Sequence, residues 1–370
     1  MECFGKHIWN KVTKEELLSI QIENPKEELK RAVHQKWDAV AKPLDSMGDF
    51  EDLFAQMGAI TGTIKLDISK KAVIIMCADN GIVEEGVSQS GQEVTAAVAR
   101  NMVRKQSSVG KMAAVIGADT IPVDIGINQK ERIDGMVQRK IRYGTANFSK
   151  EPAMTEEEAI RAILVGIEMV EECKEKGYQL LATGEMGIGN TTTSSAIATA
   201  LLDCEAAELT GRGAGLSDSG LARKQQVITQ ALEHYKLRDA DALKVLSTVG
   251  GLDIAGLAGV CIGGAIYHIP IVLDGVISLV AALVAERLLP GVRNYLLPSH
   301  NGKEPAVRRL MEELALKPVI DAGLALGEGT GAVMMFALLD MAMVVYDTGS
   351  TFEEIQIEQY VRQVCKNHIW

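Results

Sequence analysis

The sequence predicts an α/β fold, a doubly wound parallel sheet with a smaller helical lobe formed by the N- and C-terminal segments. Two observations carry this prediction. Short apolar runs that end in a polar, Gly-containing turn recur along the chain, as is typical of buried parallel strands. Segments with a helical pattern separate these runs, and such alternation favours parallel strands joined by crossover helices. We place the lobe at residues 1–65 with 300–370, and a large α/β domain at 66–299.

The composition is consistent with this fold and excludes some classes of binding partner. The chain has 370 residues, of which 47% are hydrophobic and only 4% aromatic, so the core must be built from small and aliphatic side chains. The net charge is 38 − 49 = −11. An acidic protein without a compensating basic cluster is a poor partner for nucleic acid or an anionic membrane. We therefore expect neither of these partners.

The first elements are expected to be helices. Thr13 with Glu16 three residues later forms a capping-box pattern. Asn24 followed by Pro25 indicates the start of a second helix, which Pro43 ends.

The strands and helices of the large domain then alternate. The apolar runs predict strands at 72–81, 120–126, 179–187 and 269–275, with one more at 292–300. Helical patterns lie between them, at 93–106, 156–176, 192–202, 223–234, 241–249 and 276–288. The tail from Thr351 to the end predicts a final helix with Thr351 as its cap.

Cysteine usage and hydropathy indicate a cytoplasmic protein. The six cysteines are scattered without CxxC spacing, which is typical of free thiols in a reducing compartment. The most apolar stretch, 254–273, contains His268 and Pro270 and has the pattern of a helix followed by a strand. We predict no membrane span.

Two glycine-rich turns, 184–196 ("GEMGIGNTTTSSA") and 210–220 ("TGRGAGLSDSG"), suggest an anion site. Glycine lets the backbone approach a phosphate, and the N–H groups at a helix start attract an anion. The alternative is that glycine ends strands while Ser and Thr cap helices. Two such turns beside acidic strand ends favour a nucleotide or sugar-phosphate site. Neither turn is a P-loop or a GxGxxG fingerprint.

A phosphate site in so acidic a protein needs a cation. Arg212 lies within the second turn, and Arg223 and Lys224 follow it. The alternative is that Lys224 is a solvated lysine on a helix face, and spacing alone slightly favours that alternative.

Metal chemistry finds little support in the sequence. The six histidines are far apart and form no HxxxH or HExxH motif, so we predict no metal site. Four acidic residues at strand ends have two interpretations. They bind Mg²⁺ together with a substrate phosphate, or they only cap loops. These residues are Asp79, Asp124, Asp253 and Asp274.

Glu185 and Glu328 each lie on a glycine turn before a helical segment. One interpretation is a favourable pairing of the carboxylate with the helix dipole. The other is a base that this pairing keeps ionised, ready to accept a proton from a substrate. The spacing is compatible with both.

Taken together, the motifs resemble a known family. "CADNGIVEEGVS", "EVTAAVARNM", "GEMGIGNTTTSSA", "VGGLDIAGLAGV", "LDGVISLVAAL", "LLPSH" and "LGEGTGA" appear in this order over roughly residues 40–345. The chain resembles the nicotinate-nucleotide–dimethylbenzimidazole phosphoribosyltransferases, which activate the lower base of cobamides. The resemblance implies a Rossmann-like sheet with a small helical lobe, a homodimer, and no metal or cofactor.

The resemblance also implies the reaction and its residues. Phosphoribosyl passes from nicotinate mononucleotide to a lower-ligand base, giving nicotinate and an α-ribosyl phosphate, with Glu328 as general base. It places Glu185 at the nucleotide site and Lys224 at the phosphate. The complete substrate-binding set that we expect is Glu185, Gly187, Asn190, Lys224, Asp274, Gly275, Ser90 and Val98.

The departures from the family pattern concentrate on the acceptor side. Asn80 stands in place of a histidine, Gly91 in place of a proline, Val98 in place of a glutamine, and "KPLDSMG" replaces "KPxGSLG" at 42–48. We therefore hypothesise an acceptor other than, or broader than, dimethylbenzimidazole, such as a phenol. One alternative is a non-catalytic or partner-dependent subunit of a heterodimer with a homologous chain, as in phenol-accepting relatives. Another is an unrelated nucleotide-binding kinase or ligase, against which the missing P-loop counts.

Overall fold

The computed structural model describes residues 12–362, which divide into two compact units. The larger unit contains the described residues up to Asn24 and Ile68–Met335. The smaller unit contains Pro25–Asp67 and the chain from Phe336 onward. The predicted small lobe, 1–65 with 300–370, differs from this division at two places. The described residues up to Asn24 and residues 300–335 belong to the larger unit, within which helix α13 (Ala306–Leu314) packs on α12 (Val276–Leu288).

A six-stranded sheet, entirely parallel, forms the centre of the larger unit. Its order is β3-β2-β1-β4-β5-β6, which is the strand order of the doubly wound nucleotide-binding folds. The predicted fold class is therefore confirmed. The strands are β1 (Lys71–Ala78), β2 (Asp119–Gly126), β3 (Val137–Gln138), β4 (Leu180–Met186), β5 (Ile271–Val272) and β6 (Leu296–Leu297).

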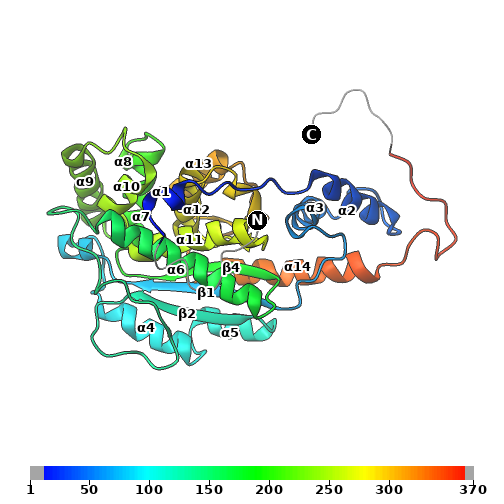
Figure 1. Cartoon of the computed structure of the whole chain (residues 1–370), viewed down its shortest axis with the longest axis horizontal. Helices are drawn as coiled ribbons and strands as arrows, with labels where there is room; N and C mark the ends of the chain where they lie inside the picture. Colours follow the sequence, from blue (N-terminus) through cyan, green and yellow to red (C-terminus); the bar gives the residue numbers. More distant parts are fainter. Residues whose placement is uncertain (1–11, 363–370) are drawn as a thin grey trace. The chain divides into compact units, whose positions relative to one another are not determined.

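Burial on both faces explains the continuous apolar runs. Every residue of β1 is buried, and β1 pairs with β2 on one side and with β4 on the other. Helices α4 (Glu93–Val103) and α5 (Ser108–Val115) cover one face of the sheet (Figure 1). On the opposite face α11 (Leu252–Tyr267) packs directly on β1, β2 and β4, and α6 (Glu156–Glu175) packs on α11.

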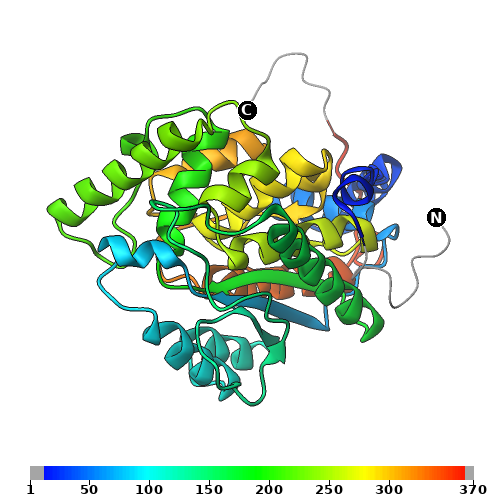
Figure 2. The same ribbon diagram turned by 60° about the vertical axis from the view of Figure 1, so that its left-hand side comes forward.

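Helix α12 packs beside α11 and on β4. Helix α12 packs against α7 (Asn190–Leu201) and α13, as the turned view shows (Figure 2). A short parallel pair, β7 (His300–Gly302) with β8 (Ile320–Leu324), forms a second sheet. The other elements are α1 (Lys14–Leu18), η2 (Gly81–Glu85), α8 (Ala206–Leu209), α9 (Asp218–Tyr235), α10 (Ala242–Val249) and η3 (Val292–Tyr295).

The smaller unit has an aromatic core. Trp37 on α2 (Glu27–Ala39), Phe54 on α3 (Asp49–Thr61) and Tyr346 on α14 (Thr330–Thr348) lie with ring centroids 5.0–5.4 Å apart. Such edge-on and tilted aromatic pairs add stability beyond the area that they bury. Helix α14 is long and apolar enough to cross a membrane, but half of its most apolar window is buried inside the protein, as in a core helix.

Two predictions at helix ends were wrong. The tail beyond Thr351 forms a single capped turn and is otherwise irregular to residue 362, while 363–370 lie outside the described residues. Ile355, Ile357 and Tyr360 are exposed there, so no buried apolar face supports a helix. The N-cap position of helix α2 is Lys26 and not Asn24, and no side chain caps the helix there.

The capping box of Thr13 and Glu16 is confirmed at α1. Cys77, Cys173, Cys204 and Cys261 are free thiols, as expected, and Cys3 and Cys365 lie outside the described residues.

Candidate active site

A cavity of about 230 Å³ opens in the larger unit at the carboxyl ends of β4 and β5. Open parallel sheets bind ligands at this edge. The wall is completed by the start of α7, the second glycine-rich turn, β7 and the loop before α14. It includes most of the site residues that we predicted: Glu185, Gly187, Asn190, Asp274, Gly275 and Glu328.

Ser90, Val98 and Lys224 are not in the cavity wall. Ser90 and Val98 are half-buried, in the bend before α4 and on α4 itself. One turn before Val98, the Thr95 hydroxyl accepts a hydrogen bond from the N–H of Ile188, which does line the cavity. Helix α4 thus supports the cavity from behind. The role of Ser90 and Val98 at the acceptor remains a prediction.

The loop that carries Glu328 has an unusual backbone. Gly327, Glu328 and Gly329 all have positive φ, at 84°, 62° and 93°. Positive φ is uncommon for a residue with a side chain and is often found at functional sites. A Cβ on Gly327 would lie 2.5 Å from a carboxyl oxygen of Glu185, so only glycine fits there.

The start of α14 does not bind Glu328, contrary to our expectation. Its free N–H groups donate to Asp274: Gly331 to Oδ1 at 2.8 Å, Ala332 to Oδ1 at 3.2 Å, and the preceding Gly329 to Oδ2 at 3.1 Å. Asp274 is 2% exposed, and these donors with His300 oppose the rise in the pKa of Asp274 that burial causes. Asp274 is therefore a clamp on the loop that carries Glu328.

The carboxylate of Glu328 has a different environment. Burial raises its pKa, and the N–H of Val109 at the start of α5 acts in the opposite direction. Its Oε2 atom is buried and has no hydrogen-bond partner among the described residues. A carboxylate with a raised pKa and a free oxygen is more basic than an ordinary glutamate, which suits a proton acceptor.

Glu185 is buried more deeply. Burial raises its pKa to about 8, and a hydrogen bond from Asn190 only partly offsets this effect. The same Asn190 amide donates to Asp253 at 3.0 Å, and burial raises the pKa of Asp253 to about 6. The N–H of Glu328 lies 3.4 Å from Glu185 Oε1. Glu185 is therefore largely protonated at neutral pH and contacts the loop of the second carboxylate.

Lys224 is the one of the three candidate cations that is buried beside the cavity. It is 0% exposed, so the alternative of a solvated lysine was wrong. Its Nζ lies 2.9 Å from the Thr191 hydroxyl, and burial lowers its pKa to about 8. Arg212 pairs with Asp218, and Arg223 pairs with Glu85, both on the surface.

The acidic strand ends are held by protein partners. Asp124 pairs with Lys140 at 3.1 Å, and Asp79 accepts the N–H of Asn128 at 2.7 Å. Asp253 and Asp274 are bound as described above.

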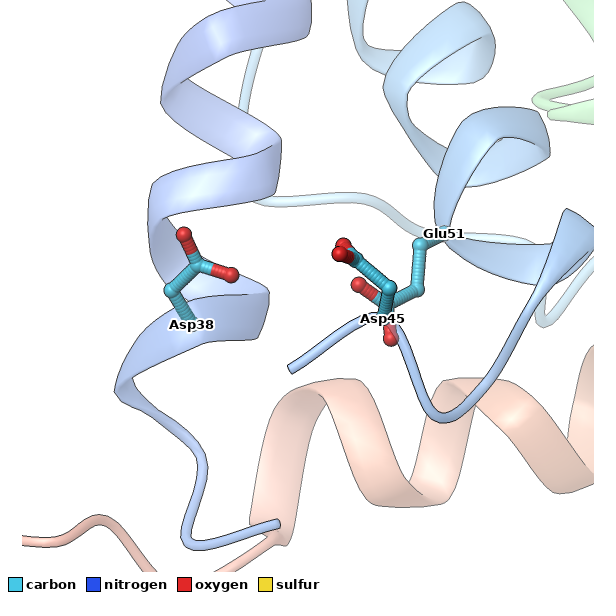
Figure 3. A group of neighbouring side chains, drawn as sticks. All are labelled: Asp38, Asp45 and Glu51. Atoms are coloured by element: carbon cyan, nitrogen blue, oxygen red, sulfur yellow. The ribbon is translucent and has the colours of Figure 1, made fainter. Parts of the chain in front are cut away.

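Within 12–362, one group of carboxylates is close enough to share an ion, and it lies in the smaller unit (Figure 3). It consists of Asp38, Asp45 and Glu51. Arg362 donates to both aspartates, at 2.7–3.0 Å, and Lys42 lies 2.6 Å from Glu51. These cations make the group an ion-pair cluster.

Sequence reasoning missed several residues of the site. Thr191, His300, Glu304 and Leu326 line the cavity but are absent from the predicted set. Glu304 accepts the N–H of Gly213 in the second glycine-rich turn at 3.1 Å. No local motif indicates this contact, because 91 residues separate the two partners.

The arrangement has two chemically distinct ends. One end gathers an ammonium, a hydroxyl and a glycine-rich turn, which together suit a phosphate. The other end has two carboxyl groups with raised pKa values, which suit proton transfer. A ribose phosphate bound across the cavity would present its anomeric carbon near the carboxyl end.

Comparisons with known proteins identify the family. Residues 22–357 match a family described as Phosphoribosyltransferase. The nicotinate-nucleotide–dimethylbenzimidazole phosphoribosyltransferase of Acetivibrio thermocellus is 48% identical over 90% of this chain and 95% of its own length. That of Clostridium acetobutylicum is 46% identical over 89% and 93%.

Solved structures give the same result. The crystal structure of the enzyme of this name from Thermus thermophilus superimposes with a TM-score of 0.84 at 35% identity, over 90% of this chain and 100% of that one. The fold, the two-ended cavity and these likenesses together show that the chain belongs to the nicotinate-nucleotide–dimethylbenzimidazole phosphoribosyltransferase family.

Proposed function

We propose that this chain transfers the phosphoribosyl group of nicotinate mononucleotide to a lower-ligand base, giving an α-ribosyl phosphate and nicotinate for cobamide synthesis. Membership of the family carries the reaction class. The observation that supports the residue roles is that one cavity is lined both by Glu328 and by Thr191, whose hydroxyl is contacted from behind the wall by the buried Lys224.

The leaving group needs no acid catalysis from the enzyme. The ring nitrogen of nicotinate is cationic in the substrate, so nicotinate departs without needing a proton when its bond to the anomeric carbon breaks. The attacking nitrogen of the base forms the new bond from the opposite face, which inverts the configuration. The attacking nitrogen carries no proton, so the ring becomes cationic as the bond forms, and Glu328 takes the proton from the other ring nitrogen. The raised pKa of Glu328 favours this acceptance.

The nucleotide is bound at the other end. Lys224 with the Thr191 hydroxyl, and the N–H of Gly213, would bind the phosphate. Protonated Glu185 would donate a hydrogen bond within the nucleotide site, since its carboxyl is neutral below about pH 8. We expect the enzyme to act in the cytoplasm as a homodimer. Light scattering of the purified chain would detect the dimer, and a homologous chain that co-purifies with it would instead support a heterodimer.

The acceptor side carries the departures from the family pattern, so we propose a range of acceptors broader than dimethylbenzimidazole. Val98 removes a polar group from α4 that would contact a second ring nitrogen. Asn80 is fully buried beneath the Gly187–Gly189 turn, and its amide lies 3.5 Å from the carbonyl of Ile188. A phenol carries one acidic proton and no second nitrogen, and Glu328 would deprotonate it as it attacks.

The test is an assay with nicotinate mononucleotide and a panel of acceptors, with products resolved by mass spectrometry. The panel contains dimethylbenzimidazole, benzimidazole, adenine, phenol and p-cresol. We expect ribosyl phosphates of several acceptors, and kcat reduced by roughly 100-fold or more in Glu328→Gln, within the range of general base catalysis. Glu313→Gln, at a surface glutamate paired with Arg287, is the matched control. Product from dimethylbenzimidazole alone would refute the broader range, and normal turnover of Glu328→Gln would refute the base.

A further inference from the structure

The second glycine-rich turn already holds a carboxylate. Glu304, between β7 and α13, accepts the N–H of Gly213 at 3.1 Å. Gly213 has a φ of +52°, a backbone conformation that favours glycine. A Cβ on Gly211 would lie 1.9 Å from Glu304 Oε2, so the carboxylate lies directly against the glycine backbone. Backbone N–H groups in such a turn bind anions.

The same carboxylate faces the buried cation. The charge of Glu304 raises the pKa of Lys224, against the larger effect of burial. Lys224 contacts the Thr191 hydroxyl at 2.9 Å, and a Cβ on Gly213 would lie 2.8 Å from that hydroxyl oxygen. An N–H, a hydroxyl and an ammonium therefore converge on one region, and Glu304 takes the place of an anion there.

We propose that Glu304 determines the affinity of this subsite for a phosphomonoester, because substrate phosphate and the Glu304 carboxylate compete for the same donors. This inference rests on the proposed function, which places the substrate phosphate at this turn. Two anions in one set of donors repel each other, so Glu304 must move aside when phosphate binds. The displacement of Glu304 weakens the binding of every phosphate ligand. Nicotinate mononucleotide offsets it with ribose and ring contacts, whereas inorganic phosphate has no such contacts.

The opposite role for Glu304 is also chemically sensible. As a counter-ion it would keep Lys224 charged, and as a hydrogen-bond acceptor it would hold the turn in shape. Both of these roles predict that removing its charge weakens the binding of phosphate. The competition that we propose predicts that phosphate binds more tightly, so the sign of the effect decides between the two.

The experiment measures the dissociation constant of inorganic phosphate by calorimetry at pH 6.5, below the pKa of about 8 of Lys224. Glu304→Gln keeps an oxygen for the Gly213 N–H but removes the charge. We expect it to bind phosphate about tenfold more tightly, because a neutral side chain no longer repels the phosphate. Glu304→Ala should also bind more tightly, and it serves if the first variant unfolds. Glu312→Gln, at an exposed glutamate of α13 paired with Arg308, should match the wild type.

A Lys224→Met variant separates this inference from the proposed function. Loss of phosphate binding in Lys224→Met, with tighter binding in Glu304→Gln, supports both. Loss in Lys224→Met with unchanged or weaker binding in Glu304→Gln overturns the competition alone. Unchanged phosphate binding and unchanged transfer activity in Lys224→Met would remove the phosphate from this turn and overturn the competition, while the transferase function would stand. Absence of transfer activity in the wild type would overturn the proposed function.

Discussion

Two glutamates that look alike in the sequence have different environments in the structure. Both lie on glycine turns before a helical segment, so the sequence alone could not separate them. Glu185 lies inside strand β4 and is buried, whereas Glu328 lies on a loop with positive φ and is half-buried. Exposure and backbone conformation therefore distinguish the two carboxyl groups, although both line the cavity.

The clamp by Asp274 could not be predicted from local sequence. The pattern "LGEGTGA" indicates a carboxylate at a helix start, and the helix dipole favours such a carboxylate. The structure instead gives the N–H groups to Asp274, which follows β5 and lies 55–58 residues away in the sequence. The sequence therefore indicates that a carboxylate lies near the start of α14. Which carboxylate accepts the N–H groups depends on the order of the strands, because Asp274 follows β5.

We predict that Asp274→Asn lowers kcat by roughly 10- to 100-fold, the scale expected when a catalytic group is misplaced by about 1 Å. One oxygen of Asp274 accepts from Gly331 and Ala332, and an asparagine oxygen can keep these two bonds. The amide nitrogen would then face the N–H of Gly329, and two donors repel each other.

The measurement is steady-state kinetics together with circular dichroism. A loop that holds Glu328 less firmly should also shift the acidic limb of the pH profile of kcat, which a purely structural loss of active protein would not do. Asp321→Asn, at an exposed residue of β8, is the control. Normal kcat and an unshifted profile in Asp274→Asn would show that the clamp is not needed.

At the scale of elements, close backbone contact joins α6 to α11. A Cβ on Gly166 would lie 2.0 Å from the carbonyl oxygen of Gly256, and one on Gly259 would lie 1.9 Å from that of Ile163. Such distances occur only when two helix backbones approach without side chains between them. Because α11 packs directly on the central strands, this crossing supports the sheet that carries the site.

We predict that Gly166→Ala lowers the free energy of unfolding by about 3 kcal/mol, the upper part of the range for overpacking. The added methyl group meets backbone atoms, which cannot rotate away as a side chain can. Gly220→Ala on α9 is the matched control, since its nearest neighbour is the end of the flexible Leu216 side chain and alanine favours the helix. Denaturant unfolding gives the free energy of unfolding of both variants and of the wild type. Equal values for Gly166→Ala and the wild type would contradict the close contact between the backbones of α6 and α11.

Elements with a strong pattern were predictable, and short ones were not. The segment 276–288 matches α12 residue for residue, because a long apolar helix buries its pattern in the core. Strands β3, β5 and β6 contain only two residues each, and neighbouring strands determine their limits. Strand β8 has no buried residue, so its sequence lacks the apolar run that indicates a strand.

The residues of the candidate site were only partly predictable, because some of their contacts depend on tertiary packing. Motif resemblance led to the residues that line the cavity from β4, β5 and the loop before α14. Spacing alone slightly favoured a solvated Lys224, because burial depends on tertiary packing. The contact of Glu304 with the glycine-rich turn depends on how β7 and α13 meet that turn, and no pattern in the sequence encodes this.

At the scale of the whole molecule, the acidic groups at the carboxyl edge of the sheet make stability depend on pH. Burial raises the pKa of Glu185 to about 8, whereas an unfolded glutamate ionises near its ordinary value of 4.5. Between these values the folded state holds a proton that the unfolded state has lost. The contribution of Glu185 to stability is therefore fully present below about pH 4.5 and is lost as the pH rises through about 8.

We predict that Glu185→Gln removes part of this loss. A glutamine stays neutral at every pH, and its oxygen can still accept the hydrogen bond from Asn190. The wild type should lose on the order of a few kcal/mol between pH 5.5 and 8.5 through this group, since one pKa unit corresponds to about 1.4 kcal/mol. The measurement is the free energy of unfolding at both pH values for wild type, Glu185→Gln and a control, Glu157→Gln, at an exposed residue of α6. Glu157→Gln should show the same decrease as wild type and Glu185→Gln a smaller one. An equal decrease in all three proteins would mean that Glu185 is ionised in the folded state, and it could then not donate a hydrogen bond to the nucleotide at neutral pH.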